Sequence, residues 1–145
     1  MYQKNQIQIV LMKTFSCVSL AFLTVIFACK KSDDQTSILQ KWQVDGFLEH
    51  IDSVAQYPTS SIFIEFKSDK TFSIQLEANK CSGTFNKAEK KLSIEGLACT
   101  EICCDSAFSL KLLPLLSKVD SYYFSNEFLS LSGENELNIR LKNPE

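Results

Sequence analysis

The sequence predicts an α+β fold that is mainly β, with an antiparallel sheet of about seven short strands curled around a core and one helix. Two observations carry this prediction. Apolar residues alternate with polar ones over short runs, as in 71–77, where Phe72, Ile74 and Leu76 share one face. A single longer stretch, at about 105–117, repeats its apolar residues at helical spacing instead.

Turn residues divide the chain into strands. The strands expected in chain order are 42–47, 62–66, 71–77, 91–95, 121–125, 128–131 and 137–141. The alternation also continues at Cys81, Gly83 and Phe85, which share a face. We expect Gly96 to mark a bulge or a bend after 91–95, because a glycine inside a strand pattern often does so.

The predicted helix has a start signal and one disruptive residue. Asp105 is a suitable N-cap, because its side chain can accept a hydrogen bond from the first backbone amides of the helix. The buried stripe would consist of Phe108, Leu112 and Leu115 or Leu116. Pro114 lies inside this pattern and is expected to kink or shorten the helix, since it has no backbone N–H.

The composition excludes several classes of protein. The chain has 145 residues, a net charge of -2, 45% hydrophobic and 22% charged residues, which fits one ordinary globular domain. A disordered tail, a coiled coil and a strongly basic nucleic-acid binder are excluded, so we expect no nucleic-acid partner. The single histidine and the low glycine content leave little for proton transfer or for a phosphate-binding loop. We therefore expect no enzymatic activity and no cofactor.

Residues 1–28 have the pattern of a lipoprotein signal peptide. Lys13 precedes an apolar run at 15–28, which is shorter than the roughly 20 residues of a membrane-spanning helix. The run ends at Ile26 to Cys29, a segment that resembles a bacterial lipobox. This resemblance implies that Cys29 is acylated and becomes the first residue of the mature chain. An uncleaved short membrane anchor is the alternative.

Met12 is expected to be the true start of translation, because Met12 and the following lysine begin a complete signal peptide. Residues 29–38 are polar and are expected to form a flexible tether ahead of a domain at 39–143. Lys30 to Asp34 resembles the tether of lipoproteins exported to the cell surface in some bacteria, with an ordinary solvated linker as the alternative. We expect a lipid-anchored protein of the outer membrane, exposed at the cell surface, whose partner is the membrane through the lipid on Cys29.

Two motifs resemble the META/HslJ domain family. Asn79 and Gly83 lie in a segment similar to its Asn-x-x-x-Gly-x-aromatic hairpin, and Thr100 to Cys104 resembles its Thr-x-x-x-Cys segment before the helix. The resemblance extends from Trp42 to Leu141. It implies a small envelope domain, often lipid-anchored and loosely linked to stress or antibiotic tolerance, with no general enzymatic activity. Because Ala78 stands where the family often has cysteine, the disulfide arrangement is expected to differ.

Four cysteines remain for the folded domain: Cys81, Cys99, Cys103 and Cys104. In an oxidising envelope they favour two disulfides. Two adjacent cysteines would close a strained ring, so we expect Cys81 to pair with one of the adjacent cysteines and Cys99 with the other. Cys81 facing Cys99 across neighbouring strands, with the adjacent two free, is an open alternative. A Zn or Cu(I) site and a redox-active pair are weaker hypotheses, because Cys-x-x-Cys is absent.

Several other side chains are candidate site residues. His50 and Asp52 lack the Gly-x-Ser-x-Gly motif of a hydrolase, so we interpret His50 as a loop residue in contact with solvent. Three glutamates are expected to face solvent beside lysines: Glu65, Glu77 and Glu95. The run from Tyr122 to Phe124 puts an aromatic side chain on both faces of the sheet. We expect a core role for Tyr122 and Phe124, and an exposed patch for a partner is the alternative.

These features predict a non-catalytic envelope lipoprotein with a META/HslJ-like domain, acting by binding or in tolerance of envelope stress. A lipocalin-like carrier of a small apolar ligand is an alternative, because an antiparallel sheet can curl around an apolar cavity. A Cys-based metal or redox sensor is a further alternative. The expected partner, besides the membrane, is an unknown protein or a small apolar ligand. A cavity would favour the carrier, a filled core a partner-binding module, and converging thiols the sensor.

Overall fold

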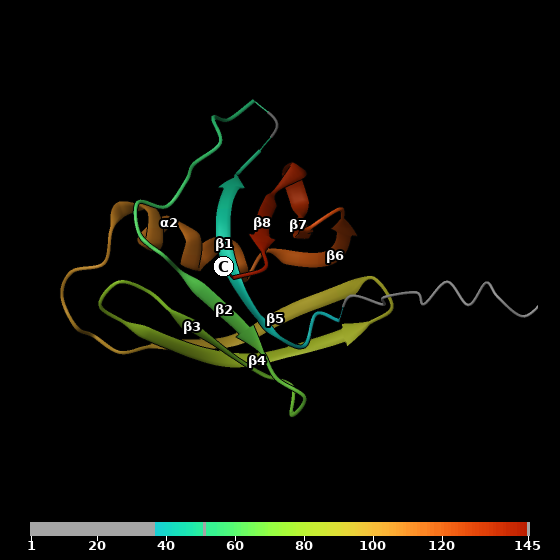
Figure 1. Cartoon of the computed structure of the whole chain (residues 1–145), viewed down its shortest axis with the longest axis horizontal. Helices are drawn as coiled ribbons and strands as arrows, with labels where there is room; N and C mark the ends of the chain where they lie inside the picture. Colours follow the sequence, from blue (N-terminus) through green and yellow to red (C-terminus); the bar gives the residue numbers. More distant parts are fainter. Residues whose placement is uncertain (1–36, 51, 145) are drawn as a thin grey trace, which may run out of the picture. The chain divides into compact units, whose positions relative to one another are not determined.

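A computed structural model describes residues 37–50 and 52–144, which form a closed antiparallel barrel with one α-helix (Figure 1). The expected signal peptide, Cys29 and most of the expected tether lie outside the described residues. The prediction of a mainly β fold is confirmed, with eight strands in place of about seven. The elements are β1 (Lys41–Leu48), β2 (Phe63–Phe66), β3 (Thr71–Gln75), β4 (Lys80–Ala88), β5 (Lys91–Cys99), α2 (Ala107–Leu116), β6 (Val119–Ser125), β7 (Phe128–Gly133), the 3-10 turn η1 (Glu134–Glu136) and β8 (Asn138–Lys142).

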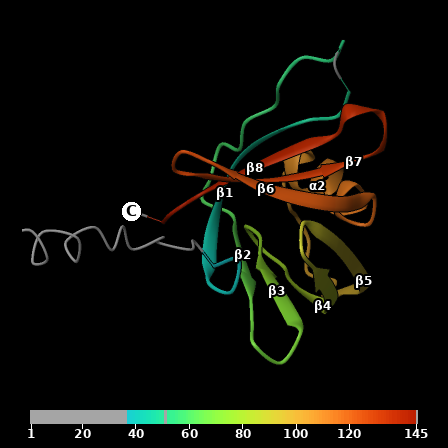
Figure 2. The same ribbon diagram turned by 90° about the vertical axis from the view of Figure 1, so that its right-hand side faces the viewer.

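The strands follow one another around the barrel in chain order, which Figure 2 shows as a ring. Each strand pairs antiparallel with the next, and β8 returns to pair with β1, so the sheet closes on itself. The shortest strand pairing is between β5 and β6, where Lys91 and Ser121 form the one register pair. The chain inserts α2 between these two strands. The helix therefore enters the fold where the strand pairing is shortest.

Side chains that point inward form one hydrophobic cluster. Alternate residues of each strand contribute to it, as the period-two pattern predicts, and α2 adds its apolar stripe. The Trp42 indole N–H donates to the Ile38 carbonyl oxygen at 3.0 Å, so this large buried ring keeps its polar atom paired. The largest fully buried side chains are Trp42, Phe66, Phe72, Ile38, Ile62, Ile64, Ile74, Leu92, Leu112, Leu116, Leu129 and Leu131.

The N-cap of α2 is Ser106, whose Oγ accepts from the backbone N–H of Ser109 at 3.2 Å. The prediction of Asp105 as the N-cap is therefore wrong. The carboxylate of Asp105 is engaged elsewhere, by the backbone amides of Ala78 and Asn79. Two neighbouring residues were both good caps, and a contact distant in sequence decides between them.

The rest of the helix follows the sequence pattern. The stripe is confirmed, and it includes both leucines at its end: Phe108, Leu112, Leu115 and Leu116 are all buried. Pro114 lies inside the helix, which ends two residues later at Leu116. Gly96 has φ 65 and lies where the β4–β5 register shifts, so the expected bulge is present.

The two ends of the barrel carry different loops. At the end that we call proximal, the chain begins β1 at Lys41 and ends β8 at Lys142, and the β2–β3, β4–β5 and β6–β7 turns lie there. The opposite, distal end carries the β1–β2, β3–β4 and β7–β8 loops and both connections of α2. Gln40 Nε2 donates to Asn143 Oδ1 at 3.0 Å, so the start and the end of the domain lie side by side.

Candidate functional site

Asn79, a residue of the family motif, is a buried hydrogen-bonding centre. Its Oδ1 accepts from Thr100 Oγ1 at 2.7 Å and from the Ile102 backbone N–H at 2.8 Å. Its Nδ2 donates to the Ile102 carbonyl oxygen at 2.6 Å and to Asp105 Oδ2 at 2.7 Å. Asn79 is only 7% exposed, so its side-chain amide is satisfied almost entirely by protein groups. The motif joins the β3–β4 turn to the loop before α2.

Asp105 completes this network from the other side. Its Oδ1 accepts from the backbone N–H of Ala78 at 2.9 Å and from that of Asn79 at 3.2 Å. Burial raises the pKa of Asp105, but these amide donors and the Asn79 side chain outweigh it and lower the pKa below the ordinary value. Asp105 is therefore a charged acceptor that fixes the turn in place.

Gly83 is required by close packing. A Cβ at this position would lie 2.6 Å from the Glu95 carbonyl oxygen and 2.6 Å from a ring carbon of Phe72. No larger residue fits without displacing β5 backbone or a core ring. The structure thus brings Asn79 and Thr100 together and assigns Gly83 a separate steric role. All three act in the architecture of the domain.

Glu77 differs from its expected position, because its carboxylate is held by three serine hydroxyls. It was expected to face solvent beside lysines, but its carboxylate accepts from Ser60 Oγ at 2.8 Å, Ser106 Oγ at 2.8 Å and Ser109 Oγ at 2.7 Å. Burial raises the pKa of Glu77, but the three hydroxyl donors outweigh it and lower the pKa from 4.5 to about 2. The carboxylate also stands at the N-terminus of α2, where negative charge is favourable.

The four cysteines are joined as Cys81–Cys99 and Cys103–Cys104. The expectation that Cys81 pairs with one of the adjacent cysteines is wrong, because the β4–β5 register places Cys81 directly opposite Cys99. The cross-strand alternative describes this pair correctly. It fails for Cys103 and Cys104, which are bonded to each other in the exposed loop before α2.

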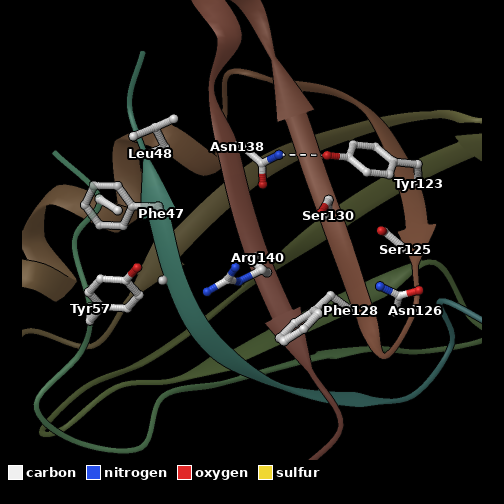
Figure 3. Close-up of a pocket in the computed structure, with 12 residues that line it drawn as sticks. Phe47, Leu48, Tyr57, Tyr123, Ser125, Asn126, Phe128, Ser130, Asn138 and Arg140 are labelled. Atoms are coloured by element: carbon white, nitrogen blue, oxygen red, sulfur yellow. Dashed lines mark hydrogen bonds between the residues drawn. The ribbon is translucent and has the colours of Figure 1, made fainter. Parts of the chain in front are cut away.

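A groove of about 490 Å³ lies on the outer face of the barrel (Figure 3). One wall is β1 with the β1–β2 loop, the other is the β6–β7 hairpin, and β8 runs between them. Tyr57 and Tyr123 stand on opposite walls and are 60% and 44% exposed. The lining residues are Gly46, Phe47, Leu48, Ala55, Tyr57, Tyr123, Ser125, Asn126, Phe128, Ser130, Asn138 and Arg140.

The β1–β2 loop is held against β1, and this contact builds the first wall. The backbone N–H of Phe47 donates to the Gln56 carbonyl oxygen at 2.9 Å, and the N–H of Gln56 donates back at 2.8 Å. Gly46 makes the approach possible, because a Cβ there would lie 2.6 Å from the Gln56 carbonyl oxygen and 3.0 Å from the Tyr57 ring. The position of Tyr57 is thus set by backbone pairing.

Arg140 and Asn138, two polar residues of the groove, each have a side-chain partner. Arg140 Nε donates to Asp45 Oδ2 at 2.7 Å in an ion pair, and the guanidinium lies over the Phe128 ring, 4.8 Å from its centroid. Asn138 Nδ2 donates to the Tyr123 hydroxyl oxygen at 2.9 Å, the dashed line in Figure 3. The groove therefore presents aromatic faces and neutral polar atoms, which suits a partly apolar ligand without net charge.

The aromatic run of β6 divides between the two faces as its spacing predicts. Tyr122 points inward, is 8% exposed and donates its hydroxyl to the Glu89 carbonyl oxygen at 2.6 Å. Tyr123 points outward into the groove. Phe124 is 37% exposed and contacts the ring of Trp42, with centroids 6.1 Å apart. Tyr122 is thus a core residue as expected, whereas Tyr123 and Phe124 are exposed, and Tyr123 is the one that lines the groove.

The remaining candidates do not gather into a site. His50 and Asp52 are both exposed in the β1–β2 loop, and Ser53 Oγ donates to the His50 carbonyl oxygen at 2.6 Å. Across residues 37–50 and 52–144, no three side chains of His, Cys, Asp or Glu converge as metal ligands would. Within the same ranges, no helix has both the length and the apolar character needed to cross a membrane.

The described residues thus form a small β domain. It is a closed eight-stranded barrel with one inserted helix, a hydrogen-bonded cluster around Asn79 and an outer aromatic groove. The META domain family matches residues 36–144, and the chain belongs to this family. No curated protein matches the chain.

Three solved structures share the fold. A DUF4847 family protein from Bacteroides vulgatus is 14% identical with a TM-score of 0.58, covering 76% of this chain and 96% of its own. A protein from Burkholderia xenovorans, solved by NMR, is 16% identical with a TM-score of 0.60, covering 73% and 82%. A further NMR structure is 13% identical with a TM-score of 0.52, covering 74% and 92%. At these identities the likeness extends to the fold alone.

Proposed function

We propose that this chain is a non-catalytic envelope lipoprotein, held at the outer membrane through a lipid on Cys29, whose META domain binds a peptide segment of another envelope protein. The observation that carries the proposal is the groove of Figure 3, where exposed aromatic side chains gather outside a filled barrel. Tyrosine, phenylalanine and arginine are the residues enriched where proteins bind one another. The groove volume of about 490 Å³ is enough for a side chain and its flanking backbone.

The filled interior supports a binding module over a carrier. A lipocalin-like carrier needs an apolar space inside the barrel for its ligand. Here the inward-pointing side chains form one continuous cluster of buried residues, in which Trp42, Phe66 and Phe72 are each less than 2% exposed. A partner is therefore expected at the outer surface.

The anchor is tested by replacing Cys29 with Ala and following the protein in membrane fractions and by incorporation of labelled palmitate. The variant should lose the label and either leave the membrane fraction or remain as uncut precursor. Cys17→Ala, which changes another cysteine of the apolar run, is the matched control and should behave as the unaltered protein. Unchanged membrane partitioning of Cys29→Ala with normal processing would refute lipid anchoring.

The groove is tested in cells with a photoreactive phenylalanine analogue at Tyr123. The control carries the analogue at Leu110, which is 62% exposed on α2 and does not line the groove. A defined protein adduct should form from position 123 alone, and Phe128→Ala in the same chain should reduce it. Equal adducts from both positions, or an adduct indifferent to Phe128→Ala, would contradict binding in the groove.

A redox sensor is the second candidate function, and it rests on the exposed Cys103–Cys104 bond. A dithiol reductant could open this bond by two-electron exchange, giving two thiols and an oxidised reductant. The chain would be equilibrated in glutathione buffers of graded potential and alkylated, and its modified cysteines identified by mass spectrometry. The sensor hypothesis requires alkylation of Cys103 and Cys104 under conditions that leave Cys81–Cys99 intact. Simultaneous reduction of both bonds would reject it.

A further inference from the structure

The charged side chains of the barrel are divided between its two ends. The turns and strand ends of the proximal end carry seven lysines: Lys41, Lys67, Lys70, Lys87, Lys90, Lys91 and Lys142. Against them stand four carboxylates: Glu65, Asp69, Glu89 and Glu127. All of these lysines except the half-buried Lys142 are exposed. Among the residues that the structure describes, the proximal end therefore has an excess of three positive charges, although the chain as a whole is acidic.

The distal end has the opposite sign. Its loops and strand ends carry eight carboxylates: Glu49, Asp52, Glu77, Glu101, Asp105, Asp120, Glu134 and Glu136. Only three lysines accompany them there: Lys80, Lys111 and Lys118. The domain is thus an electrical dipole along the barrel, with five excess negative charges at the end remote from Ser37.

We propose that the lysine-bearing proximal end is a membrane-facing surface that binds anionic lipid headgroups. This inference rests on lipid anchoring through Cys29. Ser37, the first described residue, lies at the proximal end, eight residues after Cys29. Even a fully extended tether of that length reaches no more than about 30 Å, at ~3.6 Å per residue. The tether adds no net charge, because Asp33 and Asp34 offset Lys30 and Lys31.

Charge complementarity selects the occupant and its orientation. Headgroup phosphates are anionic, and basic clusters beside a membrane anchor are attracted to them within a screening length of about 10 Å. The same surface repels the acidic distal end. A domain tethered this closely would therefore turn its proximal end to the bilayer, and the β1–β2 loop with Tyr57 would point away from the membrane toward a partner.

The experiment separates headgroup binding from anchoring. A non-lipidated chain of residues 29–145, with Cys29→Ser, is mixed with vesicles of neutral phosphatidylcholine or with about 30% phosphatidylglycerol, and the bound fraction is measured by sedimentation. We expect binding to the anionic vesicles to be at least tenfold stronger than to neutral ones, and to fall between about 50 and 300 mM salt. Failure of lipidation in cells would leave this measurement unaffected.

Two triple variants, each of which loses three lysine charges, test whether the proximal end is the surface that binds the vesicles. Lys67→Gln, Lys90→Gln and Lys91→Gln together remove proximal charge, whereas Lys80→Gln, Lys111→Gln and Lys118→Gln together remove distal charge. Circular dichroism verifies that both variants fold. The proximal variant should lose most of its vesicle binding and the distal one should keep it. Equal losses, no loss in either variant, no preference of the parent chain for anionic vesicles, or binding to soluble polyphosphate without binding to vesicles would each overturn the proposal.

Discussion

Asn79 and Asp105, 26 residues apart, are joined side chain to side chain at 2.7 Å, and Asp105 also accepts from the backbone N–H of Asn79 at 3.2 Å. The two residues fasten the β3–β4 turn to the segment that leads into α2. Because β5 and β6 share only a short pairing, this fastening helps to hold the helix where the sheet is weakest. The family motif is thus a structural latch.

Replacing Asn79 with Ala should destabilise the domain by about 2–4 kcal/mol, because the Thr100 hydroxyl, the Ile102 backbone groups and the Asp105 carboxylate all lose a partner. Urea unfolding of the non-lipidated chain measures this change. Asn143→Ala is the matched control, since Asn143 makes an exposed bond with Gln40, and it should cost less than about 0.5 kcal/mol. Equal stability of the two variants would disprove the latch.

Gly83→Ala should cost about 1–3 kcal/mol, because its Cβ would overlap the Glu95 carbonyl oxygen and the Phe72 ring. Gly96→Asn provides the comparison. Gly96 has φ 65 with open space around it, and asparagine tolerates that backbone conformation, so this variant should remain close to the parent. Thermal unfolding distinguishes the two variants. A Gly83→Ala chain as stable as the parent would show that the β5 backbone moves to accept the added methyl group without a cost in stability.

Stability should fall in acid partly through Glu77. Its pKa is about 2 in the folded domain against an ordinary value of 4.5, so the folded state binds the proton less well. The stabilising contribution is therefore present above about pH 5 and is lost as the pH falls toward 2. The lowered pKa values of Asp105 and Asp69 act in the same direction.

Glu77→Gln tests this assignment. The variant should be less stable than the parent at pH 7, and its free energy of unfolding should decline less between pH 5 and pH 2. Glu127→Gln, which removes a carboxylate from the exposed β6–β7 turn, should keep the parent's acid response. Parallel curves for the parent and Glu77→Gln would show that the serine cluster contributes nothing to acid sensitivity.

The two disulfides should differ in their effect on stability. Cys81–Cys99 spans 18 residues, so Cys81→Ser with Cys99→Ser should cost about 3 kcal/mol through the freed entropy of the unfolded chain. Cys103–Cys104 joins adjacent residues and closes no chain loop, so the corresponding double serine variant should change stability by less than about 0.5 kcal/mol. The urea midpoints of the two double variants measure the difference. Similar losses of stability would mean that the Cys103–Cys104 bond stabilises the loop before α2, contrary to this prediction.

Local patterns were sufficient for the strands and for the helix face. Phe72, Ile74 and Leu76 are buried as their alternation predicts, and Leu112 lies in the core as its helical spacing predicts. These features depend only on the period with which side chains return to the same face. The barrel is closed because β8 pairs with β1. This contact joins the two ends of the domain, and the local alternation of side chains does not predict which strands pair.

The site residues were harder to predict because their partners are distant in sequence. Ser106 caps the helix, whereas Asp105, the other candidate, is bound to Asn79. Glu77 resembles any exposed strand-end glutamate until the fold brings Ser60 and Ser109 to it. The groove depends on the docking of the β1–β2 loop, which no local pattern marks.

The hydrogen bond between Gln40 and Asn143 shows that the first and last residues of the domain are close together in space. A short glycine-rich linker between residues 37 and 144 would join the ends without moving a strand, and the chain could be reopened in the β1–β2 loop. Such a permuted protein would keep every strand neighbour. Its new N-terminus and C-terminus would both lie at the distal end. A lipid attached to the new N-terminus would therefore place the distal end, instead of the proximal end, next to the membrane.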